Sequence, residues 1–141
     1  MARILVPLDG SKAAQRALRH ALQLARDSGA ELRLLNVQPP MPMYGPVRAT
    51  MNASQYHAAC EALAKKALQP AQRLLARSRV KYLAHVFYGK PGETIVEAAR
   101  RLKCAAIVMG TRGLDATGNL LLGSVATRVI HRVGVPVTLV K

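Results

Sequence analysis

The chain has 141 residues, of which half are hydrophobic and a fifth are charged, so it can form one domain, residues 1–141, around its own core. Its apolar runs are far shorter than the roughly 20 residues that span a bilayer, and the first run meets Asp9 at once. We therefore expect a cytoplasmic protein with neither a membrane span nor a signal peptide. A formal net charge of +14 favours anionic partners.

The first third of the chain alternates strand and helix patterns. The apolar run over residues 3–8 predicts a strand buried on both faces, and Ser11 can cap the helix that follows. Apolar residues at helical spacing continue until Gly29 ends that helix, and residues 31–37 predict a second strand. Prolines and a glycine crowd residues 38–51, which favours an irregular surface loop there.

The remainder continues the alternation. A long helix is predicted from about Asn52, with Gln55 placed for a capping box, to about Ser78. Pro70 lies inside it and has no N–H, so we expect a kink or a break at that point. Pro136 in the last strand favours a position at the sheet edge. The other predicted elements are strands over 81–88, 105–109 and 135–140 and helices after 92 and over 124–132.

This alternation predicts an α/β fold with a single open, parallel, five-stranded sheet and helices on both faces. In such sheets, ligands bind beyond the carboxyl ends of the strands, where the strand order reverses. Two predicted strands are followed by polar or glycine-rich loops, one over Asp9–Ser11 and one starting at Gly110. If these two strands are neighbours, their loops share one crevice.

The stretch from Gly110 to Arg128 contains four of the ten glycines and no lysine. Glycine admits positive φ and allows backbone N–H groups to approach an anion. Gly123 and Ser124 stand where a helix should begin, and the free N–H groups and dipole of a helix N-terminus favour phosphate. The residues predict a phosphate site without a lysine, because GxxxxGK[ST] and GxGxxG are both absent.

The spacing Gly110-x2-Gly113-x9-Gly123-Ser124 resembles the motif of the ATP-binding branch of the universal stress protein family, G-x2-G-x9-G followed by Ser or Thr. The resemblance covers the whole chain, from ILVPLDGS through IVMGTRG to LLLGSVATRVIHRVGVPVTLV. It implies a Rossmann-like sheet of strand order 3-2-1-4-5 and a homodimer, which the C-terminal edge strand could form. The chain departs from the family at Ala105, often an aspartate, and at Lys12, which replaces a frequent acid.

The same resemblance implies a site for an adenine nucleotide, ATP with or without Mg²⁺. Asp9 would accept hydrogen bonds from the ribose hydroxyls beside Pro7, and Val37 would meet the adenine through its backbone. Met109 and Gly110 would flank the ribose, and Arg112 is left open between a phosphate contact and solvent. The phosphates would be held by Gly113, Gly123, Ser124 and Val125.

We interpret the chain as an ATP-binding regulatory module of the stress response. Without a Walker lysine, and with Asp9 and Asp115 as the carboxylates expected near the crevice, we assign no catalytic residue and expect slow ATP hydrolysis at most. The four histidines lack metal-ligand spacing, so no metal site is predicted.

Two alternatives remain open. The first is a non-enzymatic signalling module that binds partner proteins and has a vestigial nucleotide site. The second is a nucleic-acid-associated protein, which only the net charge suggests. The basic residues are spread along the sequence with no basic arm and no interleaved aromatics, and this pattern favours solvated helix faces over a nucleic-acid site.

Overall fold

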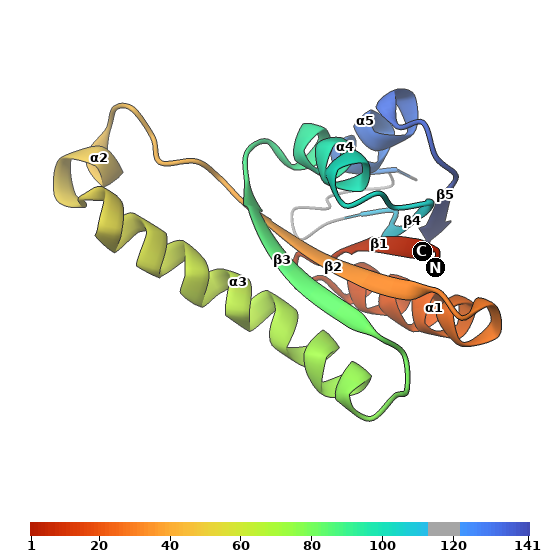
Figure 1. Cartoon of the computed structure of the whole chain (residues 1–141). Coiled ribbons are helices and arrows are strands. Elements are labelled where there is room, and N and C mark those ends of the chain that lie inside the picture. Colours follow the sequence, from red (N-terminus) through yellow and green to blue (C-terminus); the bar gives the residue numbers. More distant parts are fainter. Residues whose placement is uncertain (113–121) are drawn as a thin grey trace.

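The computed structural model describes residues 1–112 and 122–141, which form a parallel sheet with strand order β3-β2-β1-β4-β5 (Figure 1). The predicted α/β fold and strand order are confirmed. The strands are β1 (Arg3–Pro7), β2 (Glu31–Gln38), β3 (Tyr82–Tyr88), β4 (Ala106–Gly110) and β5 (Val137–Val140). The helices of the described part are α1 (Lys12–Ser28), α2 (Pro46–Thr50), α3 (Ala53–Ala76), α4 (Pro91–Arg101) and α5 (Ser124–Arg132).

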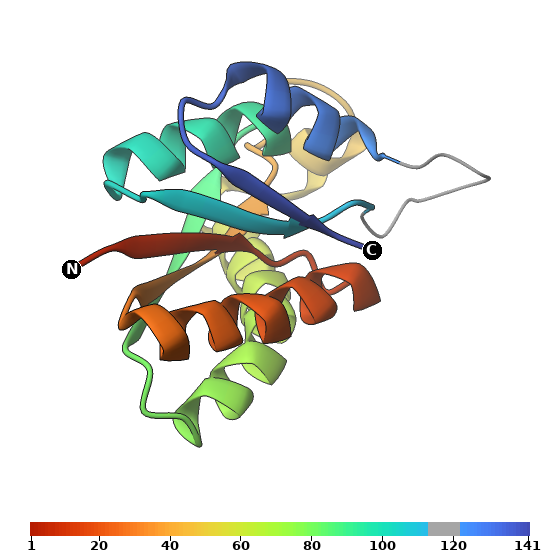
Figure 2. The same cartoon turned by 90° about the vertical axis from the view of Figure 1, so that its right-hand side faces the viewer.

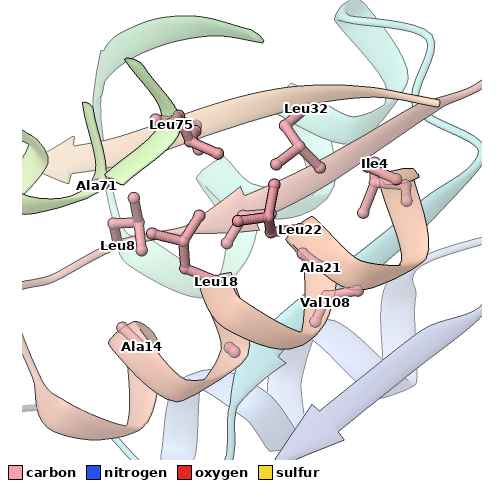
Figure 3. Close-up of a cluster of buried hydrophobic side chains, with 14 of the residues drawn as sticks. Ile4, Leu8, Ala14, Leu18, Ala21, Leu22, Leu32, Ala71, Leu75 and Val108 are labelled. Carbon is pink, nitrogen blue, oxygen red and sulfur yellow. The ribbon is translucent and has the colours of Figure 1, made fainter. Parts of the chain in front are cut away.

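Helices cover both faces of the sheet, α1 and α3 on one and α4 and α5 on the other (Figure 2). Each face has its own core because successive residues of a strand point to opposite sides. Val6 and Val108 pack with α1 and α3 in the cluster of Figure 3, whereas Leu5 and Ile107 pack with α4 and α5. All four side chains are almost completely buried.

The ends of the two long helices follow from their sequences. Ser11 caps α1, since its Oγ accepts a hydrogen bond from the Ala14 N–H at 3.1 Å. Gly29 ends α1 in the left-handed region with φ 72°, where a residue without Cβ is unstrained. At the start of α3, Asn52 and Gln55 form the predicted capping box, with reciprocal bonds of 2.8 and 2.9 Å.

The expectation of an irregular loop over residues 38–51 was wrong in part, and of the kink or break expected at Pro70 the break does not occur. The proline-rich segment contains a short helix, α2, because Pro46 is its first residue, where a missing N–H costs nothing. Nor does α3 break at Pro70: the ring lies on the exposed side, while Leu68 and Ala71 anchor the helix to the sheet. Among the helices of the described residues, none is long and apolar enough to cross a membrane.

Strand β5 lies at the edge of the sheet, as Pro136 predicted. The carbonyls of Pro136 and Val140 accept hydrogen bonds from Ile107 and Thr111, so these residues face the β4 side. Because alternate residues of a parallel strand bond to opposite sides, the backbone groups of Val137 and Leu139 face the open edge. This edge can pair with another strand.

Candidate functional site

The loops after β1 and β4 lie side by side, as predicted, because these two strands are direct neighbours. Ile4 pairs with Ala106 and Leu5 with Ile107, so both strands point their carboxyl ends to the same edge. Figure 2 shows the starts of α1 and α5 at that edge as well. The strand order reverses between β1 and β4, which is the place where open parallel sheets bind ligands. We call residues 7–11 and 109–112, with the start of α5, the crossover edge.

Asp9 presents its carboxylate to solvent at this edge. Its Oδ1 accepts a hydrogen bond from the Ser11 N–H at 2.9 Å, which fixes the turn between β1 and α1. Asp9 itself is exposed, and Ser11 rather than Asp9 caps the helix. Pro7, half-buried at the end of β1, precedes this turn. The carboxylate of Asp9 is therefore placed to accept hydrogen bonds from a ligand.

A buried polar network, which the sequence analysis missed, supports the same turn. The Asn36 Nδ2 donates a hydrogen bond to the Leu8 carbonyl at 2.8 Å, and the Gln38 Nε2 donates to the Asn36 Oδ1 at 2.7 Å. Both side chains are buried in β2. An asparagine within an otherwise apolar strand could have drawn attention to this role, since buried amides need partners.

Gly110 has a packing role that the sequence analysis did not predict. It does not have positive φ; instead β4 approaches α1 so closely there that an added Cβ would lie 2.9 Å from the Ala13 Cβ and 3.0 Å from the Ala13 backbone carbon. Distances this short are not tolerated by a packed structure. The glycine is thus required by strand–helix packing directly beneath the crossover edge.

Gly123 brings the start of α5 to the end of β4. Its N–H donates to the Thr111 carbonyl at 2.6 Å, while the Thr111 N–H donates to Val140 in β5. Gly123 precedes the first residue of α5, as predicted, but with φ −74° it also does not need glycine's conformational freedom. Thr111 is buried, and its bridging role could not be recognised without the strand pairing.

The first turn of α5 meets the expectation of an open helix N-terminus. Within residues 1–112 and 122–141, no side chain caps α5 at Gly123, and the dipole and first N–H groups of a helix N-terminus favour an anion. Ser124 is exposed there, with a hydroxyl that can donate. Val125 is half-buried and packs against the core beneath α4 and α5.

The other expected site residues differ in which of their groups can contact a ligand. Met109 is buried in the core under α4 and α5, so only its backbone can face a ligand. Val37 is half-buried at the end of β2, next to β1, and its side chain packs into the same core. Arg112 is half-buried at the crossover edge. Gly113 and Asp115 lie outside the described residues.

A family comparison identifies the chain. The model of the universal stress protein family matches residues 1–141, and the chain therefore belongs to this family. A universal stress protein of Thermus aquaticus is 35% identical over 143 residues, covering 98% of this chain and 97% of that protein. One from Methanocaldococcus jannaschii is 32% identical over 139 residues, covering 99% of this chain and 81% of that protein.

Solved structures agree in fold. The universal stress protein UspA from Lactobacillus plantarum matches with a TM-score of 0.86 at 28% identity, covering 99% of this chain and 97% of that one. A universal stress protein in complex with cAMP matches with a TM-score of 0.73 at 28% identity over 99% and 97% of the two chains. One from Archaeoglobus fulgidus in complex with dAMP matches with a TM-score of 0.73 at 25% identity over 100% and 98%.

Proposed function

We propose that this universal stress protein binds an adenine nucleotide, ATP in the first place, at the crossover edge and acts as a nucleotide-dependent regulatory module in the cytoplasm. The observation that carries the proposal is the convergence of an exposed carboxylate, Asp9, and an uncapped helix N-terminus at Gly123–Ser124 on one edge of the sheet. Ribose hydroxyls donate to a carboxylate, and phosphates bind to helix N-termini.

The two groups complement the two ends of a nucleotide. Asp9 would accept from the ribose hydroxyls, while the Ser124 hydroxyl and the first N–H groups of α5 would bind phosphate oxygens. Val37 and Met109 would contribute backbone groups beside the base and the ribose. Structures of family members carrying cAMP and dAMP support the choice of an adenine nucleotide. The motif from Gly110 to Ser124 supports a ligand with further phosphates.

Mg²⁺ and hydrolysis are secondary in this proposal. Mg²⁺ prefers oxygen ligands and is usually held by one or two carboxylates together with substrate phosphates. Asp9 is the carboxylate that the described part of the chain presents at this edge, so any Mg²⁺ would depend mainly on the phosphates. Slow ATP hydrolysis at most is what such a site supports, because phosphoryl transfer needs a charge clamp and a positioned water.

A homodimer through β5 completes the proposal. The backbone groups of Val137 and Leu139 at the open edge can pair with the same strand of a second copy about a two-fold axis. The main competing function is a partner-binding module whose nucleotide site is vestigial. The exposure of both Asp9 and Ser124 argues against it, and nucleotide binding by the purified protein separates the two.

Calorimetric titration with ATP and with adenosine tests the site. Asp9→Ala should weaken both ligands, since its partner is the ribose they share. Ser124→Ala should weaken ATP by about 10- to 150-fold, corresponding to about 1.5–3 kcal/mol for one hydrogen bond to a charged group, and spare adenosine. Asp27→Ala, which removes an exposed carboxylate at the opposite end of α1, is the matched control and should bind like wild type.

The outcome that contradicts the proposal is clear. If wild type does not bind ATP or adenosine, or if Asp9→Ala and Ser124→Ala bind both ligands as wild type does, the crossover edge is not the nucleotide site. Circular dichroism of each variant excludes unfolding as the reason for any loss.

A further inference from the structure

The outward side of α1 is a row of cations. Lys12, Arg16, Arg19 and Arg26 recur at intervals that place them on one side of a helix. The opposite side of α1 is buried, for example at Leu18. The row therefore points straight out from the sheet.

Helix α3 repeats this arrangement. Lys66, Arg73 and the C-cap residue Arg77 are exposed, and they lie opposite the buried row that includes Leu68 and Leu75. Helices α1 and α3 pack on the same side of the sheet in one core cluster (Figures 2 and 3), so their outward rows lie on the same side of the molecule. We call the two rows together the basic face; it consists of Lys12, Arg16, Arg19, Arg26, Lys66, Arg73 and Arg77.

The charge of the basic face is not balanced by carboxylates. Within residues 1–112 and 122–141, none of its cations other than Arg16 forms an ion pair, and the Arg16 Nε donates a hydrogen bond to the main-chain oxygen of Lys141. The opposite side of the molecule differs. There, Arg128 pairs with Glu93 at 2.9 Å and Arg101 with Glu97 at 3.6 Å. Arg100 and Arg132 on that side also form no ion pair among the described residues, so the distinction of the basic face is that its cations stand in two rows without a paired carboxylate.

We propose that the basic face binds the phosphate backbone of duplex nucleic acid without sequence preference. From Lys12 to Arg26, the α1 row extends about 21 Å at 1.5 Å per residue, a length over which a duplex carries roughly a dozen charges. Five of the seven cations are arginines, whose planar fork matches phosphate oxygens. The cations that seem dispersed in the sequence are thus collected by helical periodicity and by the packing of α1 beside α3.

Features of the two rows favour a duplex over other polyanions. Single-stranded nucleic acid is bound by stacking on aromatic side chains, and residues 12–26 and 66–77 contain no Phe, Tyr or Trp. Surface helices that enter a membrane expose large apolar side chains toward it. Beside the rows, Leu24, Leu74 and Leu63 are 36%, 37% and 58% exposed, and they stand at isolated positions that form no continuous apolar row.

Fluorescence anisotropy with a labelled 20-base-pair duplex of arbitrary sequence tests this inference, with charge-reversal pairs in the intact protein. Arg19→Glu with Arg73→Glu removes one contact from each row and should weaken binding roughly tenfold or more at 50 mM salt. It should also reduce the slope of log K against log salt by about 2, since each phosphate contact contributes about 0.9. The control, Arg100→Glu with Arg132→Glu, makes the same change in net charge on the opposite side and should leave affinity within about threefold.

Three outcomes overturn the proposal. Equal losses in both pairs would mean that net charge alone causes binding. Discrimination between duplexes of different sequence would contradict a backbone-only contact. Binding to phosphatidylserine vesicles, without measurable binding to the duplex at 50 mM salt, would assign the basic face to a membrane surface instead. Retained duplex affinity in the control pair together with loss in the basic-face pair supports the proposal.

Discussion

The close approach of β4 to α1 makes Gly110 a sharp test of how the crossover edge is built. An alanine at this position would place its Cβ 2.9 Å from the Ala13 Cβ and 3.0 Å from the Ala13 backbone carbon. The neighbours cannot rotate away, because one contact is with backbone and Ala13 is itself buried. The helix and the strand must therefore separate, and a separation disturbs the core on both sides of the contact.

Overpacking by one methyl group in a fixed environment costs about 1–3 kcal/mol. We therefore expect Gly110→Ala to lower the free energy of unfolding by this amount, which for a chain of this size corresponds to roughly 3–10 °C in Tm. Urea denaturation followed by circular dichroism measures the change. Gly134→Ala is the control: its Cβ would meet nothing within 4 Å and its φ is not in the left-handed region. This variant should be neutral or slightly stabilised.

The reasoning is refuted if Gly110→Ala and Gly134→Ala unfold at the same denaturant concentration. Such a result would mean that α1 shifts at no cost, and that Gly110 is needed only where a ligand approaches. A loss of ATP affinity with unchanged stability in Gly110→Ala would support that second interpretation, which is the one the sequence motif alone suggests.

Two further predictions follow from exposed and buried positions. Thr138 is exposed in β5, so Thr138→Lys leaves the core contacts of Val137 and Leu139 intact. This variant should convert a dimer formed through β5 to a monomer, which light scattering measures as a halved mass. An unchanged mass would place the interface elsewhere. Burial, and secondarily the charge of Arg33, lowers the pKa of His85 in the folded protein. As the pH drops below about 6.5, the imidazole is therefore protonated in the unfolded chain before it is protonated in the folded protein, and the free energy of unfolding should decrease. In His85→Leu, the denaturation midpoint should change less between about pH 6.5 and 5 than it does in wild type. A decline as steep as that of wild type would contradict this assignment.

Local signals in the sequence were sufficient for most of the fold. Apolar runs buried on both faces identify parallel strands, and Ser11, Gly29 and Asn52 mark helix ends through bonds to nearby backbone groups. Helix α2 could not be predicted in this way, because it buries no residue and shows no apolar period. The unbroken course of α3 through Pro70 depends on which side of the helix faces the sheet, and that is a tertiary property.

The features of the candidate site likewise fall into those that the sequence predicts and those that depend on tertiary contacts. The proximity of the loops at Asp9 and Gly110 follows from topology alone, so the sequence could predict it. The contact of Gly110 with Ala13 and the bond from Gly123 to Thr111 join residues distant in sequence, and no local pattern encodes them. The arrangement of the cations on α1 and α3 depends on tertiary structure in a similar way: helix periodicity was visible in the sequence, but the packing of α1 beside α3 was not.

The crossover edge separates the groups that hold the backbone from the groups that can meet a ligand. Gly110 and Asn36 act inward, one through steric contact with α1 and the other through a buried hydrogen bond to the Leu8 carbonyl. Asp9 and Ser124 act outward and are exposed. Buried groups that lose a partner cost stability, whereas exposed polar groups remain solvated and cost little. If the proposed site binds a nucleotide, its affinity should therefore change at Asp9 and Ser124 with little effect on the fold, while changes at Gly110 and Asn36 should act mainly on the fold.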